Sequence, residues 1–571
     1  MFARLGLFQG FDGYRQSWVR GDVIAGLTVW AVLVPESLAY ATIAGVSPVV
    51  GLYAAIPALL LYPMFGSSRH LVVGPMSATA ALSAGVVGGF ATAGSGDFAA
   101  YTTGLAIAIG VVAVVAGLLR LGFVANFISE PVLKGFIIGM ALVIIIGQVP
   151  KLLGIEGGEG NFFTRAWAIL TSLDDANMWT VAVGATALTL IVVLRHVAPI
   201  VPGSLAAVTI GILAISLFAL DDRGVAIVGE VEAGLPNPGV PDLAATDIPL
   251  LLSGAVGVML VGFAEGLGAA KTYAQKHGYR IDPDRELLGL GSANLGAGFL
   301  AGMVVNGSLS KTAVNGGAGA RSQLSGYVVA LLTVVTLIFL TGLFEQLPEA
   351  VLAAVVIAAV IELVDLDAMR RLYRVSTARL ESIYGRASRA DFIGALSAML
   401  GVLVFDTLPG LIIGVVLSVL LLLYRTSRPH VATLGRVPGG SGQWADLERH
   451  PDCETAPGIV VARVESGLFF ANADSVSDHM RTLTSDPTVH ALVLDALTTP
   501  VIDTTAADML RNLATELKVS GVQMSLVGDI GQVRDVLRAT GASTALDRVY
   551  PTIDAAVDAS RGDATAPRPG S

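Results

Sequence analysis

The chain has 571 residues, of which 54% are hydrophobic and only 14% are charged. Ordinary soluble domains carry about 25% charged residues, so most of this chain cannot face water and the composition predicts a polytopic α-helical membrane protein. The formal net charge of -10 argues against a nucleic-acid partner.

Residues 1–21 are mixed and polar, without the apolar run and small-residue cleavage site of a secretory signal, so we expect a cytoplasmic N-terminal segment. Beyond them, apolar windows long enough to cross a bilayer recur about fourteen times. With the N-terminus inside, the basic loop positions, such as Arg69 and the cluster Arg370–Arg389, fall on the cytoplasmic side. The sequence therefore predicts a transmembrane domain over 22–425, with 14 spans and both termini in the cytoplasm.

The first half of this domain contains a break in an apolar run. Gly74 and Pro75 stop regular backbone pairing, and in lipid such a segment must be buried in protein or line a polar cavity. Ser77 suits the N-cap of a helix that begins at this point. Glu36 lies midway along the first predicted span, where a charge costs at least about 2.5 kcal/mol, so we predict that it has a function.

The second half contains a similar break, over residues 303–319. A helix that begins there presents unpaired N–H groups and the positive end of its dipole, which favours an anion. Ser308 and Ser310 suit capping or direct donation to an anion, and Lys311 would supply a counter-charge. Glu265, which lies among small residues, is a second candidate carrier of a proton or cation; alternatively, it only neutralises Lys311. Paired broken helices point to the binding site of a transporter.

The C-terminal part of the sequence differs from the rest in composition. The composition becomes polar near Arg425, and we expect a linker over 426–456. Residues 457–560 alternate strand-like and helix-like runs, which predicts a small cytoplasmic α/β domain. Residues 561–571, rich in Pro, Gly, Ala and Asp, are expected to form a disordered tail.

Cysteine and histidine usage gives no sign of metal chemistry. The single cysteine, Cys453, excludes an internal disulfide framework, and the seven histidines show no metal-ligand spacing. We expect no metal and no cofactor, and we expect the chain not to be an enzyme.

Several motifs, taken jointly, resemble the SulP (SLC26) anion transporter family, and the resemblance covers nearly the whole chain. The membrane motifs are Gly51-Leu52-Tyr53, Phe65-Gly66-Ser67-Ser68-Arg69-His70, Val73-Gly74-Pro75, Ser129–Phe136 and Gly307–Asn315. The C-terminal domain resembles the STAS domain that follows the membrane part in that family, notably over Gly467–Ala473 and Val501–Thr505.

The resemblance implies a 7+7 inverted repeat divided into core and gate subdomains, an elevator-like movement, and a homodimer. The anion would lie between the half-helices of spans 3 and 10. By motif, the contributing residues are Met76, Ser77 and Ala78 from the first half-helix and Ser308, Leu309, Ser310 and Lys311 from the second. Many relatives have arginine where this chain has Lys311, so the charge is kept but the planar fork of arginine is lost.

The resemblance also bears on which ion is coupled to anion transport. The segment Glu265–Ala274 is similar to that of plant-type proton-coupled sulfate transporters, and Glu36 replaces a glutamine common in the family. Sodium-coupled bicarbonate members tend to have aspartate in place of Glu265 and a hydroxyl one turn later. This chain has Ala269 at the later position, which leaves a sodium ion short of an oxygen ligand. We therefore predict proton coupling through Glu36 and Glu265.

In the STAS-like domain, Asp503-Thr504-Thr505 matches a motif that is phosphorylated in soluble relatives. Thr504 and Thr505 are therefore candidate phosphorylation sites. Alternatively, these threonines cap a helix that starts near Ala506.

The sequence as a whole predicts a multi-pass cell-membrane transporter that carries sulfate or a similar small oxyanion together with protons. Alternatives within the transporter class are bicarbonate or a dicarboxylate as substrate and sodium as the coupling ion. Alternatives of another class are an uncoupled anion channel and a membrane scaffold or sensor linked to the STAS domain.

Overall fold

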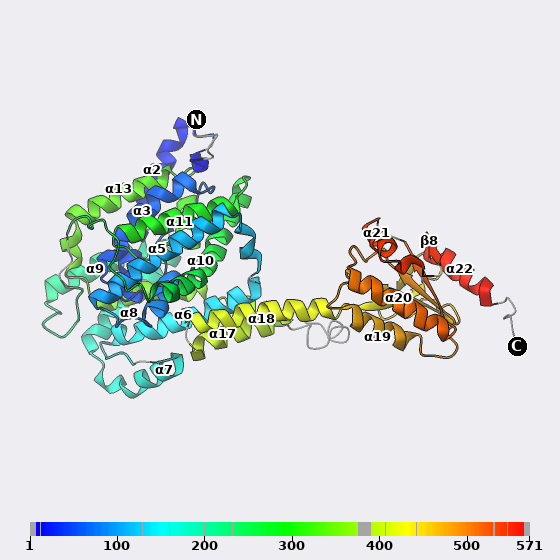
Figure 1. Cartoon of the computed structure of the whole chain (residues 1–571). Coiled ribbons are helices and arrows are strands. Elements are labelled where there is room, and N and C mark those ends of the chain that lie inside the picture. The colour runs from blue at the N-terminus through cyan, green and yellow to red at the C-terminus, as the bar shows by residue number, and fades with distance from the viewer. Residues whose placement is uncertain are drawn as a thin grey trace. The chain divides into compact units, whose positions relative to one another are not determined.

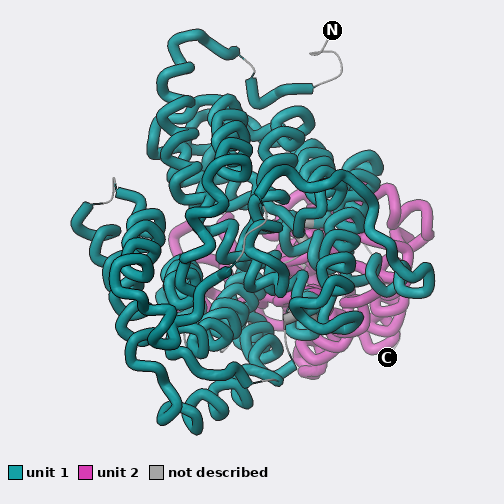
Figure 2. The backbone as a smooth tube through the Cα atoms, turned by 90° about the vertical axis from the view of Figure 1, so that its left-hand side faces the viewer, with its two compact units in different colours: residues 1–375, 391–418 teal, residues 376–390, 419–571 magenta. Residues whose placement is uncertain are grey.

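The computed structural model describes residues 7–564, except 12, 128, 159, 199–200, 230–232, 375–389, 406, 441, 529–530, 545 and 547. The chain divides into two compact units (Figure 2): unit 1 comprises residues 1–375 and 391–418, and unit 2 comprises residues 376–390 and 419–571.

Unit 1 is helical (Figure 1). Its helices are α2 (Val19–Ile43), α3 (Val49–Phe65), α4 (Ser77–Val87), α5 (Gly96–Leu118), α6 (Glu130–Leu153), α7 (Phe162–Thr171), α8 (Met178–Val197), α9 (Gly203–Phe218), α10 (Ile248–His277), α11 (Pro283–Phe299), α12 (Leu309–Gly317), α13 (Leu324–Phe339), α14 (Glu349–Val360), α15 (Leu366–Arg374), α17 (Ala390–Phe405) and α18 (Thr407–Ser427), the last of which continues into unit 2.

Short 3-10 helices connect several of these elements. They are η1 (Gln9–Phe11), η2 (Gln16–Trp18), η3 (Gly122–Phe127), η4 (Leu173–Asp175), η5 (Thr341–Phe344) and η6 (Ile361–Leu363) in unit 1, and η8 (Ala542–Thr544) in unit 2. Unit 1 also contains two short strands, β1 (Val72–Gly74) and β2 (Asn306–Ser308).

Many of the helices in unit 1 are apolar. Five of the described helices are long and apolar enough to cross a membrane, namely Gln16–Ile43, Gly96–Leu118, Glu130–Leu153, Met178–Val197 and Ile248–His277. Six shorter apolar helices accompany them: Val49–Phe65, Ser77–Val87, Gly203–Phe218, Leu324–Phe339, Asp391–Phe405 and Ile412–Ser427. The helical membrane fold is confirmed, while the count of 14 spans and the 7+7 repeat stay predictions.

Small residues allow close helix packing in unit 1. Helix α11 packs along α3 and α5, and α10 lies beside α5 (Figure 1). Gly51 of α3 lies so close to α2 that a Cβ there would overlap the carbonyl oxygen of Ser37. This contact explains the glycine of the Gly51-Leu52-Tyr53 motif, because α3 can approach the Glu36 region of α2 only without a side chain at this position.

Unit 2 contains a six-stranded mixed sheet in the order β4-β3-β5-β6-β7-β8. The strands are β3 (Val431–Arg436), β4 (Trp444–Asp446), β5 (Ile459–Val464), β6 (Ala491–Asp495), β7 (Gln523–Val527) and β8 (Arg548–Tyr550). Strands β5 to β8 pair in parallel, and β3 pairs antiparallel with β4 and β5. The helices are α19 (Ala473–Leu483), α20 (Thr504–Val519), α21 (Gly531–Ala539) and α22 (Ile553–Ala564). The predicted small α/β domain is confirmed.

Two predicted boundaries of this domain are wrong. The expected linker, 426–456, contains β3 and β4, which pair with each other, and β3 also pairs with β5, so the domain begins earlier. The expected tail, 561–571, begins inside α22, which continues to Ala564. The remaining tail residues, 565–571, lie outside the described residues.

Candidate functional site

The two predicted breaks lie next to each other in space. Strand β1 pairs antiparallel with β2, with Val72 opposite Ser308 and Gly74 opposite Asn306. Helix α4 begins three residues after β1, and α12 begins directly after β2. The two strands satisfy the backbone groups that the breaks leave free, and each strand leads into the N-terminus of a helix.

At the start of α12, Ser308 is the N-cap, and its side chain accepts a hydrogen bond of 3.3 Å from the backbone N–H of Lys311. The predicted capping role of Ser308 is therefore confirmed. The Ser308 and Ser310 hydroxyl oxygens lie 3.2 Å apart. Ser308 is buried, whereas Leu309 and Ser310 are exposed, so part of the first turn of α12 lies at the surface of the chain.

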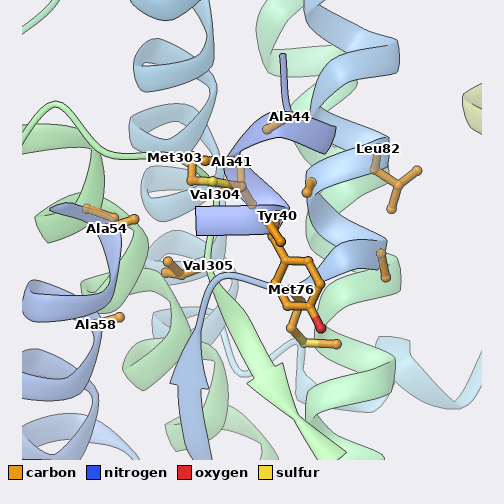
Figure 3. Close-up of a cluster of buried hydrophobic side chains, with 14 of the residues drawn as sticks. Tyr40, Ala41, Ala44, Ala54, Ala58, Met76, Leu82, Met303, Val304 and Val305 are labelled. Carbon is orange, nitrogen blue, oxygen red and sulfur yellow. The ribbon is translucent and has the colours of Figure 1, made fainter. Parts of the chain in front are cut away.

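At the start of α4, the N-cap position is Met76 rather than Ser77. The prediction that Ser77 caps this helix is wrong, because Ser77 is already the first helical residue and the helix makes its first backbone bond from Ala80 to the Met76 carbonyl. Met76, Ser77 and Ala78 are all buried beside the strand pair. Figure 3 shows Met76 near Tyr40, close to the two strand arrows.

Lys311 joins the two breaks. Its Nζ atom lies 2.7 Å from Glu36 Oε2 and donates a hydrogen bond of 3.1 Å to the carbonyl oxygen of Pro75. It also lies 4.8 Å from the centroid of the Tyr40 ring. The Lys311 side chain is 1% exposed and that of Glu36 is 9% exposed, so the pair is almost fully shielded from solvent. A lysine of the second half thus binds a carboxylate and a carbonyl of the first half.

This geometry corrects one interpretation of the sequence. Glu265 does not neutralise Lys311, because the partner of Lys311 is Glu36. Within the described part of the chain, Glu265 Oε2 is shielded from solvent and makes no hydrogen bond. Its helix, α10, packs on β2 through Gly266, where a Cβ would lie 3.0 Å from Asn306 Oδ1. Glu265 thus lies on the helix that packs against β2, the strand of the second break.

Two buried carboxylates that sequence reasoning missed hold the loops on either side of this site. Glu286 of α11 accepts hydrogen bonds from Tyr62 and from the backbone and hydroxyl groups of Ser67 and the backbone of Ser68. Asp22 of α2 accepts bonds from the backbone of Arg321 and from Ser322. Both carboxylates lie at helix starts, where acidic residues are usual, so their sequence signal was weak.

A third missed carboxylate, Glu362, had a clear signal. It interrupts the apolar run Ala358-Ala359-Val360-Ile361, and a charge in such a run marks a functional candidate. In the structure Glu362 forms an ion pair with Arg195.

Comparison with known proteins identifies the chain. A family model described as the sulfate permease family matches residues 19–383, and a STAS domain model matches residues 450–556. The chain belongs to the sulfate permease family. This family consists of transporters and not of enzymes.

Relatives of this sulfate permease family member include a probable sulfate transporter of Mycobacterium tuberculosis, which is 36% identical over 557 residues. The alignment covers 96% of this chain and 97% of that relative. The chloroplastic sulfate transporter 4.1 of Arabidopsis thaliana is 30% identical over 545 residues, covering 91% of this chain and 76% of the relative.

Solved structures share the fold. The murine Slc26a9 anion transporter in its inward-facing state superposes with a TM-score of 0.87 at 22% identity, covering 98% of this chain and 94% of that one. The transmembrane domain of the cyanobacterial bicarbonate transporter BicA gives a TM-score of 0.59 at 21% identity, covering 68% of this chain and 97% of that one. These similarities confirm the transporter fold with its STAS domain.

In the STAS domain, Thr504 and Thr505 are exposed on the first turn of α20. Asp503 caps this helix by accepting a hydrogen bond of 2.8 Å from the Ala506 N–H. The alternative in which the threonines cap the helix is therefore wrong. Their phosphorylation stays a prediction.

Proposed function

We propose that this member of the sulfate permease family is a secondary active transporter of small oxyanions that carries sulfate together with protons. The names of the relatives support sulfate as the substrate class. The observation that carries the proposal is the buried ion pair between Lys311 and Glu36 at the meeting point of the two broken segments.

The proposed anion site comprises the first turns of α4 and α12. Both helices start within the fold, and their free N–H groups and dipoles create a positive region. The residues assigned to the site are Met76, Ser77, Ala78, Ser308, Leu309, Ser310 and Lys311. Ser310 offers an exposed hydroxyl donor at the N-terminus of α12, and Lys311 supplies the full positive charge.

The ion pair offers a direct route to proton coupling. While Glu36 is ionised, it neutralises Lys311, and the site attracts an anion only through helix dipoles and hydroxyl groups. A proton on Glu36 removes this competing negative charge and leaves the ammonium of Lys311 to the anion. Anion binding and protonation of Glu36 therefore favour each other, as proton symport requires.

Glu265 is the second proposed proton carrier. Its shielded carboxylate oxygen lacks a hydrogen-bond donor among the described residues, which disfavours the ionised form. At the position where a sodium site needs a hydroxyl, Ala269 is buried and offers no oxygen ligand beyond its backbone. The absence of that hydroxyl favours protons over sodium as the coupling ion.

The remaining parts of the proposal follow the family. The membrane domain would move in an elevator-like manner within a homodimer in the cell membrane, with both termini in the cytoplasm. A change in the exposure of the α4 and α12 helix starts would carry the bound anion across the bilayer.

Uptake into proteoliposomes tests this function. Purified full-length protein is reconstituted, and the entry of labelled sulfate, bicarbonate and succinate is measured with and without an inward proton gradient. We expect sulfate uptake that increases with the gradient. Sodium-dependent bicarbonate uptake would indicate the alternative transporter, sulfate flux indifferent to any ion gradient would indicate a channel, and absence of flux would indicate a scaffold.

A further inference from the structure

A second charged pair lies in unit 1, outside the site described above. Glu362 of η6 pairs with Arg195 in the last turn of α8. The two side chains are 41% and 52% exposed, in contrast to the shielded Lys311–Glu36 pair.

The pair joins the segment after α14 to the end of α8. Helix α14 has 12 residues and is therefore about 18 Å long, against about 30 Å for the hydrocarbon core of a bilayer. At its first residue, Glu349 pairs with Lys151 of α6, and at its end the chain passes directly into η6. Arg195 lies in the last turn of α8, which is long enough to cross a membrane, so the half-exposed pair lies near one end of that span, where water can reach it.

The pair lies close to the proposed anion site. Helix α14 packs against both α8 and α2, and α2 carries Glu36. The carboxylate of Glu362 interacts electrostatically with that of Glu36, and both act on Tyr40, whose ring contacts Lys311. The charges thus follow one another as Arg195, Glu362, Glu36 and Lys311.

We propose that Arg195 is a second anion-binding residue, which holds the oxyanion on its way to or from Lys311. The planar guanidinium donates two parallel hydrogen bonds to an oxyanion, a geometry that the Lys311 ammonium lacks. Glu362 occupies and orients the guanidinium when no anion is present, and an arriving oxyanion displaces this carboxylate. This inference rests on the proposed function, because it assigns a second station to the same substrate.

The two members of the pair have opposite expected effects. Arg195→Gln removes a charged hydrogen-bond donor, so the KM for sulfate on the side of the membrane where Arg195 lies should increase about tenfold or more, with little change in thermal stability. Glu362→Gln removes the competitor for the guanidinium, so the same KM should decrease. If the ion pair only held α8 to η6, either substitution would break the same contact, and the two variants would shift the KM in the same direction or not at all.

A matched control exists at the other end of α14. The Lys151–Glu349 pair has similar exposure, at 36% and 38%, and also joins α14 to a neighbouring helix. Lys151→Gln should leave the KM unchanged. The charge swap R195E/E362R should restore the ion pair and thermal stability but not the KM. A swap that restores the KM, or single variants that shift the KM in the same direction, would overturn the proposal.

A chemical probe gives a readout that does not depend on transport. The chain has one cysteine, so Cys453→Ser gives a cysteine-free background in which Glu362→Cys is the only thiol. A sulfonate-bearing thiol reagent should label this cysteine about tenfold faster when Arg195 is present than in the Arg195→Gln variant, and sulfate should slow the labelling. Equal labelling rates in the two proteins, unchanged by sulfate, would refute anion binding at Arg195. Absence of sulfate uptake by the wild type would instead refute the proposed function.

Discussion

The ammonium of Lys311 and the carboxylate of Glu36 form an ion pair that joins the second broken segment of the membrane unit to its first helix. The 2.7 Å contact is shielded from solvent, and Lys311 also donates to the Pro75 carbonyl next to the first break. Low dielectric strengthens the attraction between such charges, while each charge alone would be costly to bury. We therefore predict two roles for the pair, stability and, under the proposed function, control of anion binding, and these roles can be separated by experiment.

Glu36→Gln should uncouple transport from protons. Glutamine mimics the protonated carboxyl, so it leaves Lys311 available to the anion at every pH. We expect sulfate exchange between the two sides to persist, while net uptake should no longer respond to an inward proton gradient. Labelled-sulfate counterflow and gradient-driven uptake measure the two activities separately, and gradient-driven uptake that survives in this variant would rule out Glu36 as a proton carrier.

Lys311→Gln should destabilise the fold more than the double substitution of both partners. Removal of one member of a buried pair leaves the other charge unpaired and costs about 3–5 kcal/mol, whereas replacement of both members is often nearly neutral. Thermal unfolding of Lys311→Gln, Glu36→Gln and the double variant in detergent gives the coupling between them. Equal stabilities of the Lys311→Gln and double variants would show that Glu36 finds another partner or a proton.

Lys311→Arg is the conservative companion variant. It keeps the positive charge and adds a planar fork, so we expect sulfate uptake to continue. Loss of sulfate uptake in this variant, together with a normal unfolding temperature, would show that the geometry at Pro75, rather than the charge, determines anion binding.

The two breaks and their chemistry could be predicted from the sequence, because glycine, proline and serine interrupt the apolar runs at positions where a continuous helix would exclude them. The capping role of Ser308 follows directly from local chemistry. The partner of Lys311 could not be predicted, because Glu36 and Glu265 both interrupt apolar helices and only the packing of α2 against α12 decides between them.

Other errors have local causes. Met76 takes the N-cap position of α4 because the backbone of the strand pair sets where the helix begins, although serine is the better capping residue. Strands β3 and β4 fall within the predicted linker because they are short and partly polar and are stabilised by strand pairing, β4 with β3 and β3 with β5. Glu362 meets the same criterion as Glu36, a charge within an apolar run, so the sequence alone could have revealed it.

Glu286→Ala should weaken the structure that leads into the first break. The carboxylate accepts hydrogen bonds from Ser67, Ser68 and Tyr62, and its removal leaves several buried donors without an acceptor, at about 1–3 kcal/mol each. Tyr62→Phe removes one of these bonds and should cost only about 1 kcal/mol. Thermal unfolding of both variants checks this order, and equal losses would contradict it.

His70 should make stability depend on pH. It lies in the loop before β1, where its Nε2 donates to the Ala320 carbonyl and its Nδ1 accepts from the Tyr279 hydroxyl, so the ring is neutral. Burial, with the nearby charge of His277, lowers the pKa of His70 to about 4. Its unfolded value is about 6.5, so the stability due to neutral His70 is present above pH 6.5 and is lost as the pH falls towards 4.

The size of this effect is at most about 3 kcal/mol. Unfolding temperatures measured between pH 4 and pH 7 should fall more steeply at low pH for the wild type than for His70→Gln. Parallel curves for the two proteins would mean that His70 does not titrate differently in the folded and unfolded states.

The most direct test of the central claim is a measurement of proton entry during sulfate uptake, with a pH-sensitive dye inside proteoliposomes that contain the full-length chain. The coupling of Glu36 to Lys311 predicts that sulfate acidifies the wild-type lumen and that Glu36→Gln abolishes this acidification while sulfate exchange continues. Sulfate entry without acidification in the wild type, or undiminished acidification in Glu36→Gln, would contradict it.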